Sequence, residues 1–417
     1  MFENYLEEDM VVIQGDYATS VVILSILIAV IASYSALTMN GRAQRIGFFH
    51  RNLWLMFASI AMGFGIWSMH FVGMSAFSLP VHMTYNVTLT VISIVPAMVA
   101  SFIAFYLSNL PKRGLWVYIL AGVSMGAGIS TMHYMGMYAM KMDISYSYNY
   151  IIFIVSIGIS VAISMLAVYI FSNLQLYMKN RWIQLSTALI MGLAVSSMHY
   201  TGMSAVTFYV PSDFHAHALA HDMGNIGGLV IIVTAGMALL LGILFLLGQI
   251  DRYVAYHTNF FDSFTKLPNR RLFEQDLRKH LFPEYLIIWQ LHGLEELNKE
   301  YSYQFVDEVI KLTAQRFQTM RPPSSELYRI EENRFAFLMK DVKESSHVKE
   351  AMQRISEYLQ TPFFIDGEKT YLSSVCAVAE ANNKTEAATL YANALAVIRH
   401  SSTKFENEVI FFDPAIH

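Results

Sequence analysis

MGFGIWSMHFVGM, residues Met62 to Met74, lies inside an apolar run and recurs as MGAGISTMHYMGM (Met125 to Met137) and MGLAVSSMHYTGM (Met191 to Met203). Six of the thirteen positions, holding Met, Gly, Met, His, Gly and Met, are identical in all three copies. The copies begin 63 and 66 residues apart, which is enough chain for two membrane spans and their connectors. We therefore predict three helix-pair repeats and a seventh helix that closes the set.

Charged residues are distributed unevenly along the 417-residue chain, and they make up only 14% of it. Soluble globular proteins have about 25%. Residues 1–250 contain 16 of the 60 Asp, Glu, Lys and Arg residues, and residues 251–417 contain the other 44. We expect a membrane domain over 1–250, a short linker or signalling helix over 251–261 and a water-soluble domain over 262–417. No basic block predicts nucleic-acid binding, and the single Cys376 fits a reducing compartment.

Seven apolar runs reach the length of about 20 residues that a helix needs to cross ~30 Å of hydrocarbon. They lie near residues 19–39, 53–76, 86–108, 115–139, 149–172, 182–208 and 226–250. The connectors on one side contain the basic residues Arg42, Arg45, Arg51, Lys112, Arg113, Lys179 and Arg181. Those on the other side contain only Lys141. The positive-inside rule then predicts a multi-pass membrane protein with its N-terminus outside and its C-terminal domain cytoplasmic.

The six identical positions share one face of each predicted helix. At about 100° per residue they fall within an arc of about 140°. The two glycines remove bulk where helices approach, so the sulfurs and imidazoles should project into a common space. His70, His133 and His199 also follow the predicted starts of their spans by 17 or 18 residues, which places them at one depth near the outer edge of the membrane.

Three imidazoles among thioethers predict a metal site. The candidate ligands are His70, His133, His199, Met62, Met69, Met74, Met125, Met132, Met137, Met191, Met198 and Met203. Imidazole and thioether together suit copper, especially Cu(I), and the lack of cysteine or carboxylate weakens the case for zinc. Haem held by two of the histidines is the alternative cofactor. Without any cofactor, the methionines and glycines would be packing residues and the histidines would hydrogen-bond between helices.

Further histidines lie in the predicted outer connectors, namely His82, His215, His217 and His221. They are candidates for capturing a metal at the membrane surface. The plainer interpretation is a polar connector that happens to be rich in histidine.

Over about residues 15–250 the chain resembles the MHYT domain, a bacterial membrane sensor of seven spans named after a tetrapeptide. That tetrapeptide reads MHFV, MHYM and MHYT here, and only the third copy is complete. The resemblance implies a copper site near the outer face that senses a diatomic gas such as oxygen, carbon monoxide or nitric oxide.

Residues 262–270, DSFTKLPNR, resemble the N-terminal signature of GGDEF domains, which condense two GTP molecules into cyclic di-GMP. The segments NALAVIR (Asn393 to Arg399) and VIFFD (Val409 to Asp413) resemble that family's last helix and strand. Alternation in YLIIWQL and a helical stretch from Val306 to Phe317 independently predict an α/β domain. The fold expected is therefore an all-α seven-helix membrane domain followed by a GGDEF-like domain with a central antiparallel sheet.

The catalytic positions depart from the GGDEF pattern. The glycine-rich signature turn reads RIEENRF here, with Glu331 and Glu332 for the glycines, Asn333 for Asp and Arg334 for Glu. Gln290 stands where the family has a metal-binding Asp, and an amide is a poorer ligand for Mg²⁺ than a carboxylate. Added negative charge should repel a triphosphate. We expect no cyclase activity.

Two positions retain the family's guanine-reading residues, Asn298 and Asp307. One interpretation is that they bind GTP without turnover. The other is that Asn298 only caps a turn and Asp307 is only a solvated residue at the start of a helix. We expect a homodimeric membrane receptor that senses a gas, redox state or copper and passes the signal to a cytoplasmic protein partner. The alternatives are a copper-handling or electron-transfer protein with a scaffold domain and, less in keeping with the signature turn, an active cyclase.

Overall fold

The computed structural model describes residues 10–44, 49–79, 81, 83–111, 114–142, 144–173, 180–211, 223–279, 284–340, 345–381, 386–401 and 407–415. They form two compact units, residues 1–252 and 253–417. Several residues used above lie outside the described ones: Arg45, Lys112, Arg113, Lys179, His82, His215, His217 and His221.

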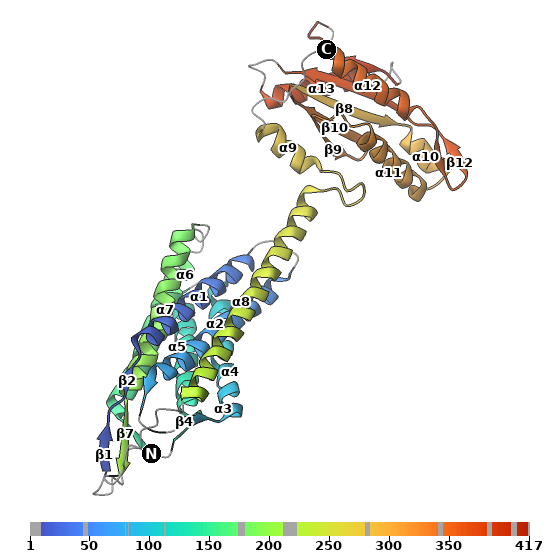
Figure 1. Ribbon diagram of the computed structural model, residues 1–417. Helices are drawn as coiled ribbons and strands as arrows, with labels where there is room; N and C mark the ends of the chain where they lie inside the picture. The colour runs from blue at the N-terminus through green and yellow to red at the C-terminus, as the bar shows by residue number, and fades with distance from the viewer. Residues whose placement is uncertain are drawn as a thin grey trace. The chain divides into compact units, whose positions relative to one another are not determined.

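The first unit is a bundle of long helices (Figure 1). They are α1 (Thr19–Arg42), α2 (Arg51–Ala76), α3 (Val87–Ile92), α4 (Ile94–Ser108), α5 (Leu115–Ala139), α6 (Tyr150–Asn173), α7 (Arg181–Ser204) and α8 (Met223–Phe260). Every predicted span is helical. Six described stretches, with α3 and α4 counted as one, are long and apolar enough to cross a membrane. Helix α7 is less apolar because it includes Gln184, Thr187 and Ser196.

The third span is interrupted at Ser93, where α3 ends and α4 begins. Pro96 follows in the first turn of α4 and has no N–H, so the carbonyl of Ile92 loses its helical partner. The Ser93 hydroxyl donates to the Thr90 carbonyl at 2.7 Å. A hydropathy scan does not register such a break because the stretch as a whole remains apolar.

Six helices form a ring in which α2, α5 and α7 are central and α4, α6 and α1 are peripheral. The first glycine of each repeat makes the close contact. A Cβ on Gly63 would lie 2.7 Å from the Cα of Met98 in α4, and one on Gly126 would lie 2.6 Å from the Cα of Val161 in α6. In the third repeat, a Cβ on Gly192 would lie 2.8 Å from the backbone nitrogen of Val30 in α1. Helix α1 therefore closes the ring, and our prediction that the last helix closes it was wrong.

Buried serines identify α1 as the equivalent of the other peripheral helices. Each peripheral element has two serines eight residues apart: Ser25 and Ser33, Ser93 and Ser101, Ser156 and Ser164. The first hydroxyl of each pair donates to a carbonyl three residues earlier, at 2.7, 2.7 and 2.8 Å. This shared spacing could have revealed the closing helix in the sequence.

Helix α8 packs outside the ring. Its Val233 and Met237 join a core cluster with Ile28 and Ala32 of α1 and Val72 of α2. The seventh span is therefore attached to the ring through α1 and α2.

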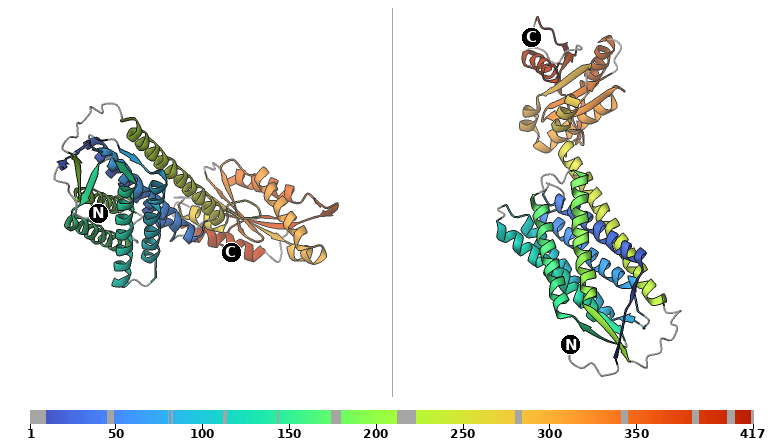
Figure 2. Two further views of the ribbon diagram at one scale, coloured as in Figure 1. Left: turned by 90° about the horizontal axis from the view of Figure 1, so that it is seen from below. Right: turned by 90° about the vertical axis from the view of Figure 1, so that its left-hand side faces the viewer.

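Short strands cover one end of the bundle, where α2, α5 and α7 finish (Figure 2). They are β1 (Met10–Ile13), β2 (Asp16–Tyr17), β3 (Phe77–Ser78), β4 (Met83–Tyr85), β5 (Met140–Met142), β6 (Ser145–Tyr148) and β7 (Val206–Pro211). Each strand that follows a central helix pairs with the strand that precedes a peripheral one: β3 with β2, β5 with β4 and β7 with β6. We call this set of strands the lid. We did not predict it, and the sixth predicted span, extended to residue 208, wrongly included the start of β7.

The second unit has a five-stranded sheet in the order β14-β13-β8-β10-β9. Its strands are β8 (Tyr285–His292), β9 (Ser325–Glu331), β10 (Arg334–Met339), β13 (Ser373–Glu380) and β14 (Val409–Phe411), and β11 (Phe363–Ile365) pairs separately with β12 (Glu368–Thr370). The helices are α9 (Arg270–Lys279), α10 (Leu294–Glu300), α11 (Tyr303–Thr319), α12 (Ser345–Leu359) and α13 (Ala387–Ser401). The sheet is antiparallel except for the parallel pair β13 and β14.

Side chains of β8 alternate between two cores, as the sequence pattern predicts. Ile287 and Trp289 pack with residues of α11 and α12 on one face. Leu286 and Ile288 pack with residues of α9 and α13 on the other. The predicted α/β fold is confirmed.

Candidate metal centre and signature turn

The three repeat histidines meet at the centre of the ring beneath the lid. Nδ1 of His70 lies 3.1 Å from Nδ1 of His133 and 3.1 Å from Nδ1 of His199. The third side of this triangle, between His133 and His199, is 3.3 Å. All three side chains are buried, at 0–1% exposure. The structure thus brings together the three residues that the sequence placed at one depth.

Hydrogen bonds among the three Nδ1 atoms cannot satisfy this triangle. A neutral imidazole nitrogen is either a donor or an acceptor. With three such atoms, at least two must be of the same kind, so at least one of the three sides joins two donors or two acceptors. A cation facing three lone pairs removes the conflict. At a metal–nitrogen distance of about 2.0 Å, three nitrogens on one face of a tetrahedron are about 3.3 Å apart, so the donor set fits a small metal ion.

The same spacing fits haem poorly. Two axial imidazoles lie on opposite sides of the iron, about 4 Å apart, with a flat macrocycle between them. The pairs His70–His133 and His70–His199, at 3.1 Å, are closer than that and leave no space for a macrocycle.

The predicted methionines fall into two layers around the histidines. Met62, Met69, Met125, Met132, Met191 and Met198 belong to the main core of the bundle. Met74, Met137 and Met203 belong to a separate cluster with lid residues such as Met83 and Met140. The sulfurs of Met62 and Met125 accept hydrogen bonds from Ser33 and Ser101, at 3.7 and 3.6 Å. Those two thioethers therefore have a partner within the protein.

The far end of α1 makes a polar contact with α8 that the sequence did not predict. The Arg42 guanidinium donates to the Gly248 carbonyl at 2.7 Å and lies 3.7 Å from the Asp251 carboxylate. It also lies 5.2 Å from the ring centre of Trp54 in α2. Both charged side chains are largely buried, at 12% and 10% exposure. In the sequence, this contact could have been suspected from the single Arg in α1 and the single Asp near the end of the last span.

The signature turn of the second unit forms internal charge pairs. Arg334 donates to the Gln290 amide oxygen at 2.8 Å and to the Glu331 carboxylate at 2.7 Å. Arg270 contacts the other Glu331 oxygen at 3.4 Å. Asn333 donates to the Leu291 carbonyl at 3.1 Å, and Glu332 is exposed at the tip. The Arg334 guanidinium thus bridges the Gln290 amide and the Glu331 carboxylate.

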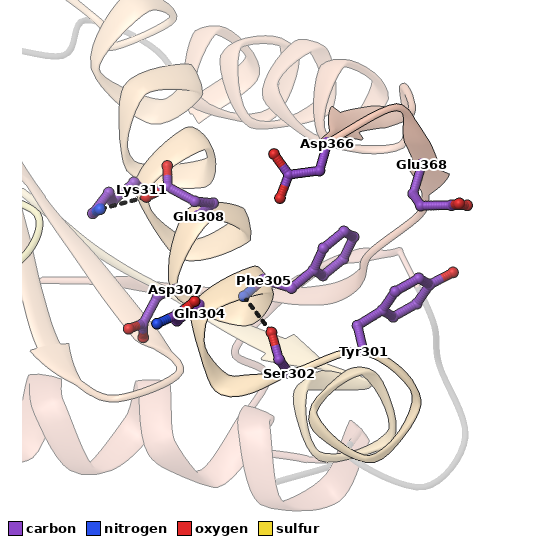
Figure 3. Close-up of a pocket in the computed structure, with 9 residues that line it drawn as sticks. All are labelled: Tyr301, Ser302, Gln304, Phe305, Asp307, Glu308, Lys311, Asp366 and Glu368. Atoms are coloured by element: carbon purple, nitrogen blue, oxygen red, sulfur yellow. Dashed lines mark hydrogen bonds and ion pairs between the residues drawn. The ribbon is translucent and has the colours of Figure 1, made fainter.

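The two guanine-reading candidates lie in different surroundings. The Asn298 side-chain oxygen is buried and has no hydrogen-bond partner among the described residues. Asp307 lines a pocket of about 590 Å³ at the start of α11, which Asn298 does not line (Figure 3). The pocket's charged lining is mainly acidic, comprising Asp307, Glu308, Asp366, Glu368 and Lys311. That charge disfavours a triphosphate.

Two family models match the chain. The bacterial signalling protein N-terminal repeat, MHYT, matches residues 63–121 and 126–182. The diguanylate cyclase GGDEF domain matches residues 259–405. The chain is therefore a membrane signalling protein that joins MHYT repeats to a C-terminal GGDEF domain.

Two homologues come from Pseudomonas aeruginosa. Bifunctional diguanylate cyclase/cyclic di-GMP phosphodiesterase MucR is 28% identical over 97% of this chain and 62% of its own length. Cyclic di-GMP phosphodiesterase NbdA is 26% identical over 95% of this chain and 54% of its own length. The chain thus spans little more than half of each relative.

A solved diguanylate cyclase/phosphodiesterase from Caldicellulosiruptor saccharolyticus is 24% identical, with a TM-score of 0.35, over 38% of this chain and 97% of that one. The GGDEF domain of FimX from Pseudomonas aeruginosa is 21% identical, with a TM-score of 0.33, over 36% of this chain and 98% of that one.

Proposed function

We propose that this protein is a bacterial inner-membrane receptor in which His70, His133 and His199 hold a copper ion through Nδ1. The observation that carries the proposal is the buried triangle of like nitrogens, with sides of 3.1–3.3 Å. Methionines on both sides of the triangle favour Cu(I) over hard cations. When bound, copper would supply an open coordination position for a diatomic gas or a change of redox state.

The distribution of basic residues supports an outer position for the lid and for the proposed site beneath it. The basic residues Arg42, Arg51 and Arg181 lie at the opposite ends of their helices, which the positive-inside rule assigns to the cytoplasm. The GGDEF domain after α8 is then cytoplasmic.

Signal transfer would follow the helices that the histidines connect. Movement of α2 or α7 acts on α1, which packs between them. The Arg42 contact passes that movement to Gly248 and Asp251 of α8. Helix α8 continues without interruption to Phe260, at the start of the GGDEF match. Such coupling needs two states with different affinities for the sensed ligand.

We propose that the GGDEF domain is a non-catalytic output module, which in a homodimer signals to a cytoplasmic partner in cyclic di-GMP signalling. The internal bonds of Arg334 with Gln290 and Glu331 support this, because they neutralise a site that otherwise needs Mg²⁺. The unpartnered oxygen of Asn298 supports a remaining guanine-binding role, with GTP bound and not turned over.

The first experiment is metal analysis of the detergent-purified full chain. We expect about one copper per chain after anaerobic loading with Cu(I), and background copper in the triple variant His70→Ala, His133→Ala, His199→Ala. Equal, negligible copper in both proteins would refute the metal proposal. A Soret band in the purified protein would instead establish haem.

The output proposal is tested by incubating the protein with GTP and Mg²⁺. We expect GTP to remain intact. Cyclic di-GMP above a protein-free blank would show an active cyclase.

A further inference from the structure

The second invariant glycine of each repeat lies against the histidine of another repeat. A Cβ built on Gly136 of α5 would lie 2.2 Å from Nε2 of His70. A Cβ on Gly202 of α7 would lie 2.5 Å from Nε2 of His133, and one on Gly73 of α2 would lie 2.5 Å from Nε2 of His199. These separations are far below the ~3.5 Å of a normal carbon contact, so each imidazole occupies the space that a side chain would need.

The contacts form a closed cycle. His70 of α2 rests on Gly136 of α5, His133 of α5 rests on Gly202 of α7, and His199 of α7 rests on Gly73 of α2. A glycine three residues after a histidine shares its helix face. Each central helix therefore presents one histidine to the triangle and one glycine to a neighbour's ring.

The contact also determines which ring nitrogen faces the centre. In each histidine the edge that carries Nε2 is pressed against the neighbouring glycine, and no Nε2 has a hydrogen-bond partner among the described residues. The edge that carries Nδ1 then points into the triangle. A larger residue at the glycine would push the ring inward or rotate it.

We propose that Gly73, Gly136 and Gly202 are positioning residues, which seat the imidazoles and so make Nδ1 the metal-facing atom. The role in orienting metal ligands rests on the proposed function, whereas the glycine–histidine pairing does not. Supporting contacts around metal ligands are typically worth 10- to 100-fold in metal affinity.

The pairing is tested without metal by a double-mutant cycle on the thermal unfolding midpoint of the detergent-solubilised full chain. We expect Gly136→Ala to lower the midpoint in the wild type and much less in a His70→Ala background, where the obstructing ring is absent. In a His133→Ala background the drop should remain as in the wild type. An equal drop in all three backgrounds would overturn the pairing.

The cycle remains informative if Gly136→Ala does not fold. Recovery of folded protein in the double variant His70→Ala, Gly136→Ala supports the pairing. Failure of that double variant, with His70→Ala alone folded, contradicts it. Gly158→Ala is the control, because a Cβ there meets nothing within 4 Å.

The metal role is tested by competition for Cu(I) with a chelator. We expect Gly136→Ala to weaken binding by about 10- to 100-fold, and Gly158→Ala to leave it unchanged. If the wild type binds copper and Gly136→Ala binds it with the same affinity, the positioning role is refuted and the proposed function is not. Absence of copper from the wild type would refute the proposed function, and the unfolding cycle would still decide the pairing.

Discussion

The histidine triangle and the signature turn differ in how their polar groups are satisfied. In the triangle, three identical nitrogens lie 3.1–3.3 Å apart and cannot all be paired with one another. In the turn, Arg334 lies between Gln290 and Glu331 and bonds to both. The first group of residues has the geometry of a cation site, and the second contains its own cation. The comparison separates a site whose geometry fits a metal ion from one whose charges are paired internally.

The largest expected effect comes from removing one corner of the triangle. His199→Ala leaves two nitrogens, so bound copper should fall to a small fraction of the wild-type level. His347→Ala is the control, since His347 is exposed in α12. Metal content of both variants checks this. Full retention of copper by His199→Ala would mean that the triangle is not the site.

The Arg42 contact pairs opposite charges within the membrane unit, and we expect its loss to cost stability. Arg42→Ala removes a largely buried cation that lies 3.7 Å from the Asp251 carboxylate. Loss of one partner of a buried pair suggests a cost of about 3 kcal/mol. The unfolding midpoint in detergent should fall clearly, whereas the exposed Arg252 should tolerate alanine. Equal midpoints for the two variants would contradict the proposed connection between α1 and α8.

Arg334→Ala should have a smaller effect, because its partners are only partly buried. The loss of two charge-assisted hydrogen bonds there suggests about 1 kcal/mol. Arg321→Ala is the control, because its contact with Glu326, at 3.5 Å, is more exposed. Denaturant unfolding of the full chain, followed by a probe in the GGDEF domain, measures both. A stabilising Arg334→Ala would show that the turn is strained rather than satisfied.

The smallest effect is a pH dependence at Asp262. Burial raises the pKa of its carboxyl, but hydrogen bonds from Thr265 and Arg329 outweigh burial and bring the pKa below its ordinary value. The stabilisation is therefore complete above the unfolded pKa of about 3.9 and is lost as pH falls through the lower folded value. The difference in midpoint between the wild type and Asp262→Asn should shrink as pH falls from about 6 towards 3. A difference independent of pH would contradict this origin.

The helical spans and the face that carries the histidines were predictable because hydropathy and the 3.6-residue period can be read from the sequence of a single helix. Which helices become neighbours was not predictable in the same way. The pairing of Gly136 with His70 joins residues 66 positions apart, and nothing in either repeat alone specifies it. The lid was missed because strands of two to six residues, such as β3 (Phe77–Ser78), are too short for an alternating pattern. In the GGDEF domain the turn substitutions were visible in the sequence, but the bonds of Arg334 depend on the hairpin register.

The most direct test of the central claim is X-ray absorption spectroscopy of the full chain loaded with Cu(I). We predict a first shell dominated by nitrogen at about 2.0 Å with the outer-shell pattern of imidazole, and its loss in the triple His70→Ala, His133→Ala, His199→Ala variant. A shell of sulfur alone that persists in the triple variant, or no bound copper in the wild type, would contradict the account.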